Sequence, residues 1–135
     1  MKELKITARS DNLHAVLDFV TEHMECAGIS PPVQVQISIA VEEIFVNIAH
    51  YAYEAEGKGE ALIRVTADSG SVTVEFTDGG IPYNPLDKPD PDILAGADER
   101  PIGGLGIFMV KKIMDTVEYR FESGKNMLTV KKIIS

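Results

Sequence analysis

One stretch constrains the fold of this chain more than any other: residues 32–54, where a line of polar side chains interrupts an otherwise apolar sequence. If the stretch is a helix turning about 100° per residue, Glu43, Asn47 and His50 fall within about 60° of one another. Most of the remaining positions are apolar, so the helix is predicted to be buried. A buried helix that presents a carboxylate, a carboxamide and an imidazole in one line must face something polar.

The composition is that of one soluble globular domain. The chain has 135 residues, of which 44% are hydrophobic and 25% are charged, which suits a single domain over residues 1–135. Its net charge of −8 disfavours nonspecific binding to nucleic acid or to an anionic membrane. The single cysteine, Cys26, excludes an internal disulfide, and the sequence shows neither a signal peptide nor a membrane-spanning stretch. We therefore expect a cytoplasmic protein with no direct contact to nucleic acid or membrane.

Hydrophobic periodicity predicts the element order β-α-α-β-β, a long irregular segment, then α-β-β. Strands are expected near residues 4–7, 61–66, 72–77, 116–122 and 127–133, and helices near 13–27, 32–54 and from 104 onward. Ser10, Asp11 and Asn12 are candidate caps for the first helix, and Gly28 is expected to end it. Because the strands form hairpins and the helices need to cover only one face, we predict an α+β two-layer sandwich with a mixed β-sheet.

The irregular segment has the character of a functional loop. Between Asp78 and Pro101 the periodicity is lost, and five of the seven prolines fall there. A structureless segment of this length inside a compact domain is usually functional. We predict a lid over residues 83–102.

Glycines at the start of the third helix form a candidate anion site. Gly103, Gly104, Leu105 and Gly106 lead into that helix, whose first backbone N–H groups would face a bound anion. Glycine also makes ordinary turns, so this signal is weak by itself. Arg100 lies just upstream and could pair with a phosphate; a solvated lid charge is the alternative.

Two further groups of residues could contact a ligand. Asp78 ends a predicted strand, where it could accept a hydrogen bond from a ligand amine while Gly80 lets a flat ring pack close; a turn aspartate is the alternative. Glu43 and Asn47, at positions i and i+4, offer the oxygen ligands that Mg²⁺ prefers. A side-chain pair on a solvated face is the alternative, which the apolar flanking positions disfavour. We interpret His50 as a supporting polar residue rather than a ligand.

Several common catalytic motifs are missing. The sequence has no GxxxxGK[ST] phosphate loop, no HExxH or CxxC metal motif and no convincing Ser-His-Asp combination. A phosphate site in this chain would therefore not be a P-loop.

Taken together, three motifs resemble a known family. In this order, Glu43-x-x-x-Asn47, Asp78-x-Gly80-x-Pro82 and Gly103-Gly104-Leu105-Gly106 resemble the N, G1 and G2 boxes of the Bergerat (GHKL) ATP-binding fold. The runs 81–85 and 104–110 further resemble stand-alone anti-sigma-factor serine kinases of bacterial partner-switching systems, of the SpoIIAB and RsbW type. The resemblance covers essentially the whole chain.

The resemblance implies a site for ATP and Mg²⁺ and a protein serine/threonine kinase activity. It implies that Asp78 accepts from the adenine amine, that Asn47 binds Mg²⁺ and that Glu43 is the catalytic base or orienter for the attacking hydroxyl. It further implies that these residues contact the nucleotide: Asn47, Asp78, Gly80, Arg100, Gly103, Gly104, Leu105, Gly106 and Thr129. Thr129 could equally be an ordinary sheet threonine.

The resemblance also implies partners. The phosphorylated protein would be a STAS-domain anti-anti-sigma factor, a sigma factor would be a second partner, and a homodimer is compatible with the family. The first helix, which would meet the sigma factor, has no Lys or Arg between Ser10 and Gly28. This keeps open a nucleotide-gated partner-binding module without significant kinase activity. A scaffold that has lost nucleotide binding is a third alternative.

Overall fold

The computed structural model describes residues 2–55, 57–87 and 104–134. The strands are β1 (Lys2–Thr7), β2 (Glu60–Ala67), β3 (Ser71–Asp78), β4 (Thr116–Glu122) and β5 (Lys125–Ile133). The helices are α1 (Leu13–Cys26), α2 (Pro31–Tyr51) and α3 (Gly104–Ile113), and short 3-10 turns lie at Ser10–Asn12 and Pro85–Asp87. This order of strands and helices confirms the prediction. Most of the predicted lid, residues 88–102, lies outside the described residues.

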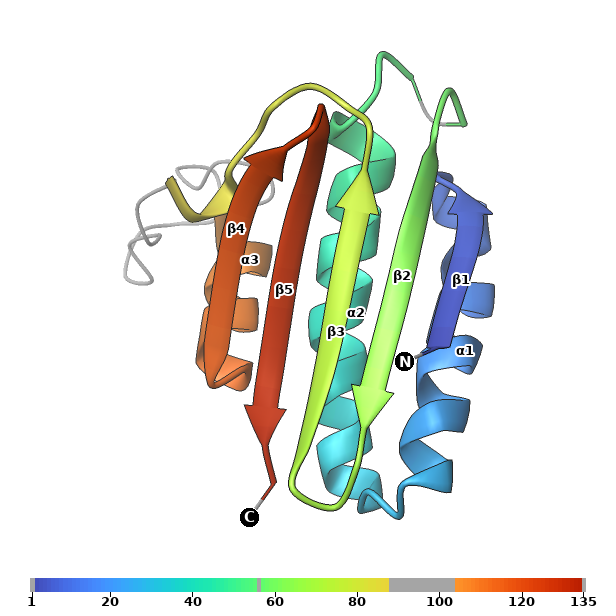
Figure 1. Ribbon diagram of the computed structural model, residues 1–135, viewed down its shortest axis with the longest axis vertical. Coiled ribbons are helices and arrows are strands. Elements are labelled where there is room, and N and C mark those ends of the chain that lie inside the picture. Colours follow the sequence, from blue (N-terminus) through green and yellow to red (C-terminus); the bar gives the residue numbers. More distant parts are fainter. Residues whose placement is uncertain (1, 56, 88–103, 135) are drawn as a thin grey trace.

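The five strands form one sheet in the order β1-β2-β3-β5-β4, and every neighbouring pair is antiparallel (Figure 1). The prediction of a mixed sheet is therefore wrong. Two helices running in opposite directions connect β1 to β2, so the chain returns to the sheet antiparallel to β1 (Figure 1). After the single helix α3, β4 runs in the same direction as β3, but β5 lies between the two strands and is antiparallel to both.

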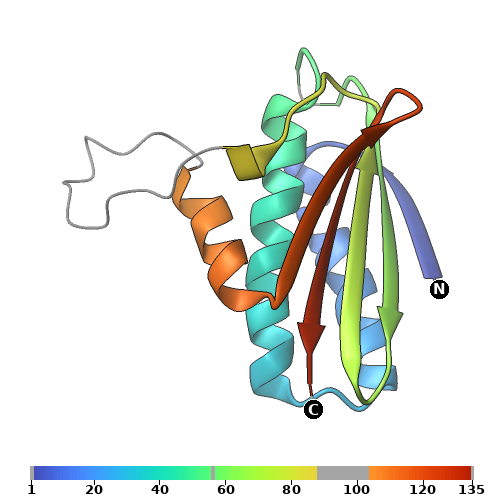
Figure 2. The same ribbon diagram turned by 60° about the vertical axis from the view of Figure 1, so that its left-hand side comes forward.

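The helices α1, α2 and α3 all cover the same face of the sheet (Figure 2). Helix α2 lies in the middle and contacts both α1 and α3. The predicted α+β two-layer sandwich is confirmed. None of the described helices combines the length and the apolarity needed to cross a membrane.

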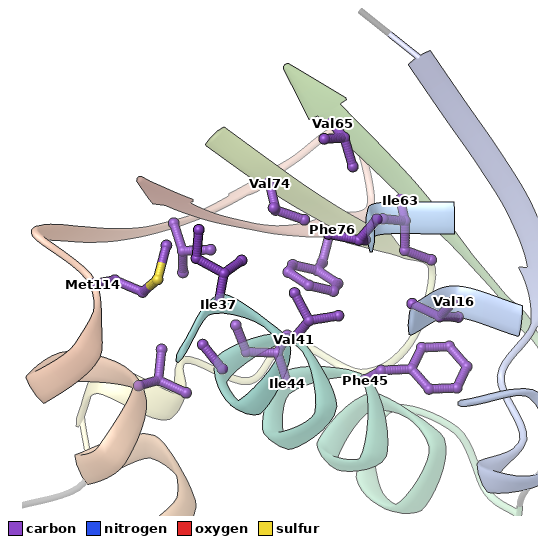
Figure 3. Close-up of a cluster of buried hydrophobic side chains, with 14 of the residues drawn as sticks. Val16, Ile37, Val41, Ile44, Phe45, Ile63, Val65, Val74, Phe76 and Met114 are labelled. Atoms are coloured by element: carbon purple, nitrogen blue, oxygen red, sulfur yellow. The ribbon is translucent and has the colours of Figure 1, made fainter. Parts of the chain in front are cut away.

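The core lies between α2 and the central strands (Figure 3). Phe45 and Ile37 of α2 are fully buried, and they belong to the same cluster as Ile63 of β2 and Phe76 of β3. Burying a side chain of this size contributes about 1.5–3 kcal/mol. This packing fixes the rotation of α2, and with it the direction in which Glu43 and Asn47 point.

The ends of the helices follow local chemistry, with two departures from the sequence predictions. Gly28 ends the α1 region with φ +77°, as expected for a residue just past a helix. Ser10–Asn12 form a 3-10 turn rather than a cap, and the side-chain amide of Asn12 donates instead to the carbonyl of Thr7 at 2.8 Å. Helix α2 ends at Tyr51 and does not reach residue 54.

Helix α2 is not buried all round. Val35 and Ile39 remain 60% and 39% exposed. Because the domain has two layers, no described element covers the outer side of the helices. The apolar outer face of α2 was therefore misread as core.

Candidate functional site

Four of the predicted site residues, Glu43, Asn47, Asp78 and Gly106, line two neighbouring hollows at one end of the sandwich. There the second half of α2, the end of β3, the beginning of β5 and the first turn of α3 come together (Figures 1 and 2). A cavity of about 40 Å³ lies between α2 and the sheet at this end. Its lining includes Asn47, Ile48, Phe76, Asp78, Tyr83 and Asn126.

Asp78 is the buried carboxylate of this cavity. It is the last residue of β3. It is only 6% exposed, because its side chain lies on the helix-facing side of the sheet. Its Oδ1 atom accepts from the backbone N–H of Gly80 at 2.9 Å and from Nδ2 of Asn126 at 3.0 Å. Among the described residues, no hydrogen bond to Oδ2 is formed. One carboxylate oxygen is thus held by the protein, and the other is left to accept from a ligand.

Asn126 was missed by the sequence reasoning, although it is 6% exposed in the same cavity. Its Nδ2 donates to Asp78 Oδ1 and to the carbonyl of Ile81, the latter at 2.8 Å. Its Oδ1 accepts from the backbone N–H of Tyr83 at 3.1 Å and from the hydroxyl of Tyr119. Strand alternation could have revealed it, because residues 126, 128 and 130 of β5 share the buried face.

Gly80 has a structural role that the sequence did not reveal. A side chain at this position would overlap the backbone carbonyl of Ala52, which accepts from the N–H of Ile81 at 2.9 Å. The glycine therefore lets the chain leaving β3 run directly against the end of α2. It shapes the wall of the cavity through the protein backbone, and the predicted contact with a ligand ring stays a prediction.

A second hollow, of about 250 Å³, lies beside the first and is lined by Glu43, Asn47, His50, Tyr51 and Gly106, among others. Asn47 and Ile107 line both hollows, and Asn47 is the polar side chain that the two hollows share. Gly106, in the first turn of α3, lines this hollow together with Glu43 and Asn47. The start of a helix is where free backbone N–H groups can bind an anion.

The carboxylate of Glu43 is half-buried, and burial raises its pKa above the ordinary value. The neighbouring charge of Glu42 raises the pKa further, as a smaller cause. A carboxylate that holds its proton more tightly is a stronger base. This environment suits a group that removes a proton from a hydroxyl.

The described residues do not provide a complete metal site. No group of three or more His, Cys, Asp or Glu side chains is arranged to hold a metal ion in this part of the chain. Mg²⁺ bound with a triphosphate needs only one or two protein oxygens, since phosphates and water supply the rest. Asn47 is suitably placed to supply one, between the buried carboxylate and the start of α3.

The other residues predicted to contact the nucleotide lie partly outside the described residues and partly away from the cavity. Arg100 and Gly103 lie outside the described residues, and Gly104 and Leu105 form the first turn of α3. Thr129 pairs with Glu75 and Glu118 on neighbouring strands, and strand alternation places it on the open face of the sheet. Leu128 faces the cavity instead. The predicted contact between Thr129 and the nucleotide pocket is therefore not supported by this geometry.

Comparison with protein families agrees with this arrangement. A family model described as the histidine kinase-like ATPase domain matches residues 6–132. The chain belongs to this family. Membership of this family implies that the chain uses ATP.

Proteins named serine-protein kinase RsbW are similar in sequence to the chain. The chain is 26% identical to the one from Listeria monocytogenes over 111 residues, which cover 79% of this chain and 71% of the relative. It is 24% identical to the one from Bacillus mycoides over 135 residues, which cover 97% of this chain and 84% of the relative.

Solved structures share the fold. The RsbU and RsbW domains of Rv1364c from Mycobacterium tuberculosis align with a TM-score of 0.61 at 14% identity, over 98% of this chain and about a third (33%) of that chain. The mycobacterial sensor histidine kinase MprB aligns with a TM-score of 0.53 at 16% identity, over 98% of this chain and 97% of that chain. Both likenesses show the fold of the family.

Proposed function

We propose that this chain is a Mg²⁺- and ATP-dependent serine/threonine protein kinase. The observation that carries the proposal is the position of Asn47, the polar residue that lines both the cavity of Asp78 and the hollow of Glu43 and Gly106. The adenine would enter the first and the phosphates the second. Asn47 would then bind the metal between them, and Mg²⁺, when bound, would neutralise phosphate charge.

In the proposed reaction Glu43 acts on the attacking hydroxyl. It takes the proton of a serine or threonine while the hydroxyl oxygen attacks the γ-phosphate and ADP leaves. The first backbone amides of α3 would hold the phosphates, and Arg100 would pair with their charge. The raised pKa of Glu43 supports this role, as do the names of the relatives.

The proposed protein substrate is a STAS-domain anti-anti-sigma factor, so that phosphorylation would regulate transcription in the cytoplasm. The support here is similarity to the RsbW relatives. A sigma factor as second partner and a homodimer are parts of the same proposal, and sedimentation analysis of the chain measures the latter.

Transfer of labelled γ-phosphate tests the kinase proposal. The chain is incubated with labelled ATP, Mg²⁺ and the cognate STAS-domain protein. Label is expected on one serine or threonine of that protein, and Glu43→Gln should lower the rate by about a hundredfold or more. Glu118→Gln is the matched control, since Glu118 is an exposed carboxylate of β4 away from both hollows. If no label is transferred and Glu43→Gln behaves like the unchanged chain, the kinase proposal is wrong.

A second candidate function is a nucleotide-gated clamp that holds a partner without phosphorylating it. It is favoured by a groove of about 370 Å³ between α1 and α2, lined by Leu17, Val35, Ile39 and Glu42 among others. Neither helix contains Lys or Arg; Glu42 of α2 lines the groove, and α1 exposes Asp18, Glu22 and Glu25. An apolar groove between two acidic helices fits a partner that presents a basic amphipathic helix.

A further inference from the structure

Asn126 holds together the floor of the nucleotide cavity. A carboxamide can donate two hydrogen bonds and accept two, and the four hydrogen bonds of Asn126 use all of this capacity. Its orientation is fixed, because the N–H of Tyr83 can only donate and the carbonyl of Ile81 can only accept. The amide is therefore unable to turn over without losing bonds in a buried site.

We propose that Asn126 is a positioning residue that sets the base specificity of this site through Asp78. The proposal rests on the proposed nucleotide-binding function. Asn126 itself forms no bond with the base in this account. It fixes the carboxylate of Asp78 and keeps its own N–H groups away from the ligand.

The hydrogen-bond inventory gives the reason for specificity. Oδ1 of Asp78 is already occupied by Gly80 and Asn126, so Oδ2 is the atom left for the ligand. A carboxylate oxygen only accepts, and both N–H groups of Asn126 are already used. A purine with a 6-amino group matches this floor. A purine with a 6-oxo group would leave two acceptors facing each other in a buried site, which a binding site strongly disfavours.

The same amide also holds the wall that encloses the cavity. Asn126 binds the carbonyl of Ile81 and the N–H of Tyr83, so it anchors the chain that leaves β3. The cavity, at about 40 Å³, has room for about three water molecules. Asn126 thereby links the carboxylate that would accept from the base to the position of Ile81 and Tyr83, which line the same cavity.

The test compares two nucleotides that differ in the 6-substituent. The full chain is titrated by calorimetry with Mg·ATP and with Mg·ITP, in which a 6-oxo group replaces the 6-amino group. Asn126→Leu keeps a side chain of similar size and removes all four hydrogen bonds. Thr129→Val is the matched control, because it changes a polar residue of the same strand on the opposite face.

We expect Asn126→Leu to lower ATP affinity by about tenfold and to reduce the ATP:ITP preference by a similar factor, since several hydrogen bonds that order the acceptor are lost. Thr129→Val should change neither. Unchanged ATP affinity and unchanged preference in Asn126→Leu would overturn the inference while leaving the ATP site intact. If the unchanged chain binds neither nucleotide, the proposed function fails, and the inference fails with it.

Two further measurements keep the test decisive if Asn126→Leu folds poorly. In the nucleotide-free chain, hydrogen exchange at the Tyr83 amide should be faster in Asn126→Leu than in Thr129→Val, because the amide has lost its acceptor.

If circular dichroism shows that Asn126→Leu does not fold, the ATP:ITP preference of Tyr119→Phe tests the inference instead. This substitution removes only the hydroxyl bond to Asn126. A two- to threefold lower ATP:ITP preference, about the effect of one weak hydrogen bond, would support the inference, and an unchanged preference would overturn it.

Discussion

The carboxylate of Glu43 on α2 occupies the space that a side chain on Gly106 of α3 would fill. The two helices therefore approach closely where the proposed catalytic base lies. The atom in the way is the end of a flexible side chain, so a methyl group at position 106 would displace the carboxylate without disturbing the backbone.

Gly106→Ala should separate folding from catalysis. Alanine is a better helix former than glycine by about 1 kcal/mol, so thermal denaturation should show equal or higher stability. Phosphate transfer to the STAS-domain protein should fall by about a hundredfold, because a displacement of about 1 Å at a catalytic group can cost that much. ATP affinity should change far less. Transfer at the rate of the unchanged chain would mean that the position of Glu43 is not critical.

Gly80→Ala should instead destabilise the fold. Its new methyl group would meet the backbone carbonyl of Ala52, which cannot rotate away as a side chain can. We expect a loss of about 2 kcal/mol or more in the free energy of unfolding, measured by chemical denaturation. Gly79→Ala is the control, since its methyl group would lie at an ordinary 3.7 Å from the hydroxyl of Tyr53. Equal stabilities of the two variants would contradict this explanation for Gly80.

Glu43→Gln should change how stability depends on pH. The folded chain holds the proton of Glu43 to a higher pH than the unfolded chain does, because burial raises the pKa. The free energy of unfolding therefore decreases as the pH rises from the ordinary pKa of glutamate through the raised pKa of the folded chain. Above the raised pKa the decrease stays constant. Glutamine removes this loss, so the variant should be the more stable at neutral pH and should show less decline across that range. Chemical denaturation of both chains at several pH values measures this dependence. The same change of stability with pH in the two chains would argue against a raised pKa of Glu43.

Val35→Ser combined with Ile39→Ser tests the groove between α1 and α2. Both side chains are exposed, so the double variant should keep its stability within about 1 kcal/mol. Binding of a partner that presents a basic amphipathic helix to this groove should weaken by about tenfold or more, because apolar contact area is lost there. ATP affinity serves as the internal control and should not change. Undiminished partner binding would place the contact elsewhere.

The sequence predicted the fold well because its signals are local. Alternation in residues 61–66 and 72–77, helical spacing from Leu13 and the glycines at positions 28 and 103–106 each act over a few residues. The mixed sheet was wrong because strand direction depends on the insertion of β5 between β3 and β4, and no local pattern encodes that pairing. Val35 and Ile39 look like core residues, since an apolar side chain does not reveal whether a third layer covers it.

The candidate site was predictable where motif spacing matches the helix period. Glu43 and Asn47 share a face because they are four residues apart, and that relation survives in any helix. Asn126 could not be found in this way, because its partners come from β3, β4 and the chain after β3. The nucleotide contact was predicted for Thr129, but the neighbouring residue Leu128 lines the cavity. Successive strand residues point to opposite faces, so an error of one position moves a side chain to the other face.

Calorimetric titration with Mg·ATP, comparing the unchanged chain with Asp78→Asn, tests the central claim most directly. The substitution keeps the shape of the side chain and removes an acceptor-only oxygen from the cavity floor. The account predicts ATP binding by the unchanged chain and affinity at least about a hundredfold lower in the variant. Absence of binding by the unchanged chain, or equal affinity of the two, would contradict it.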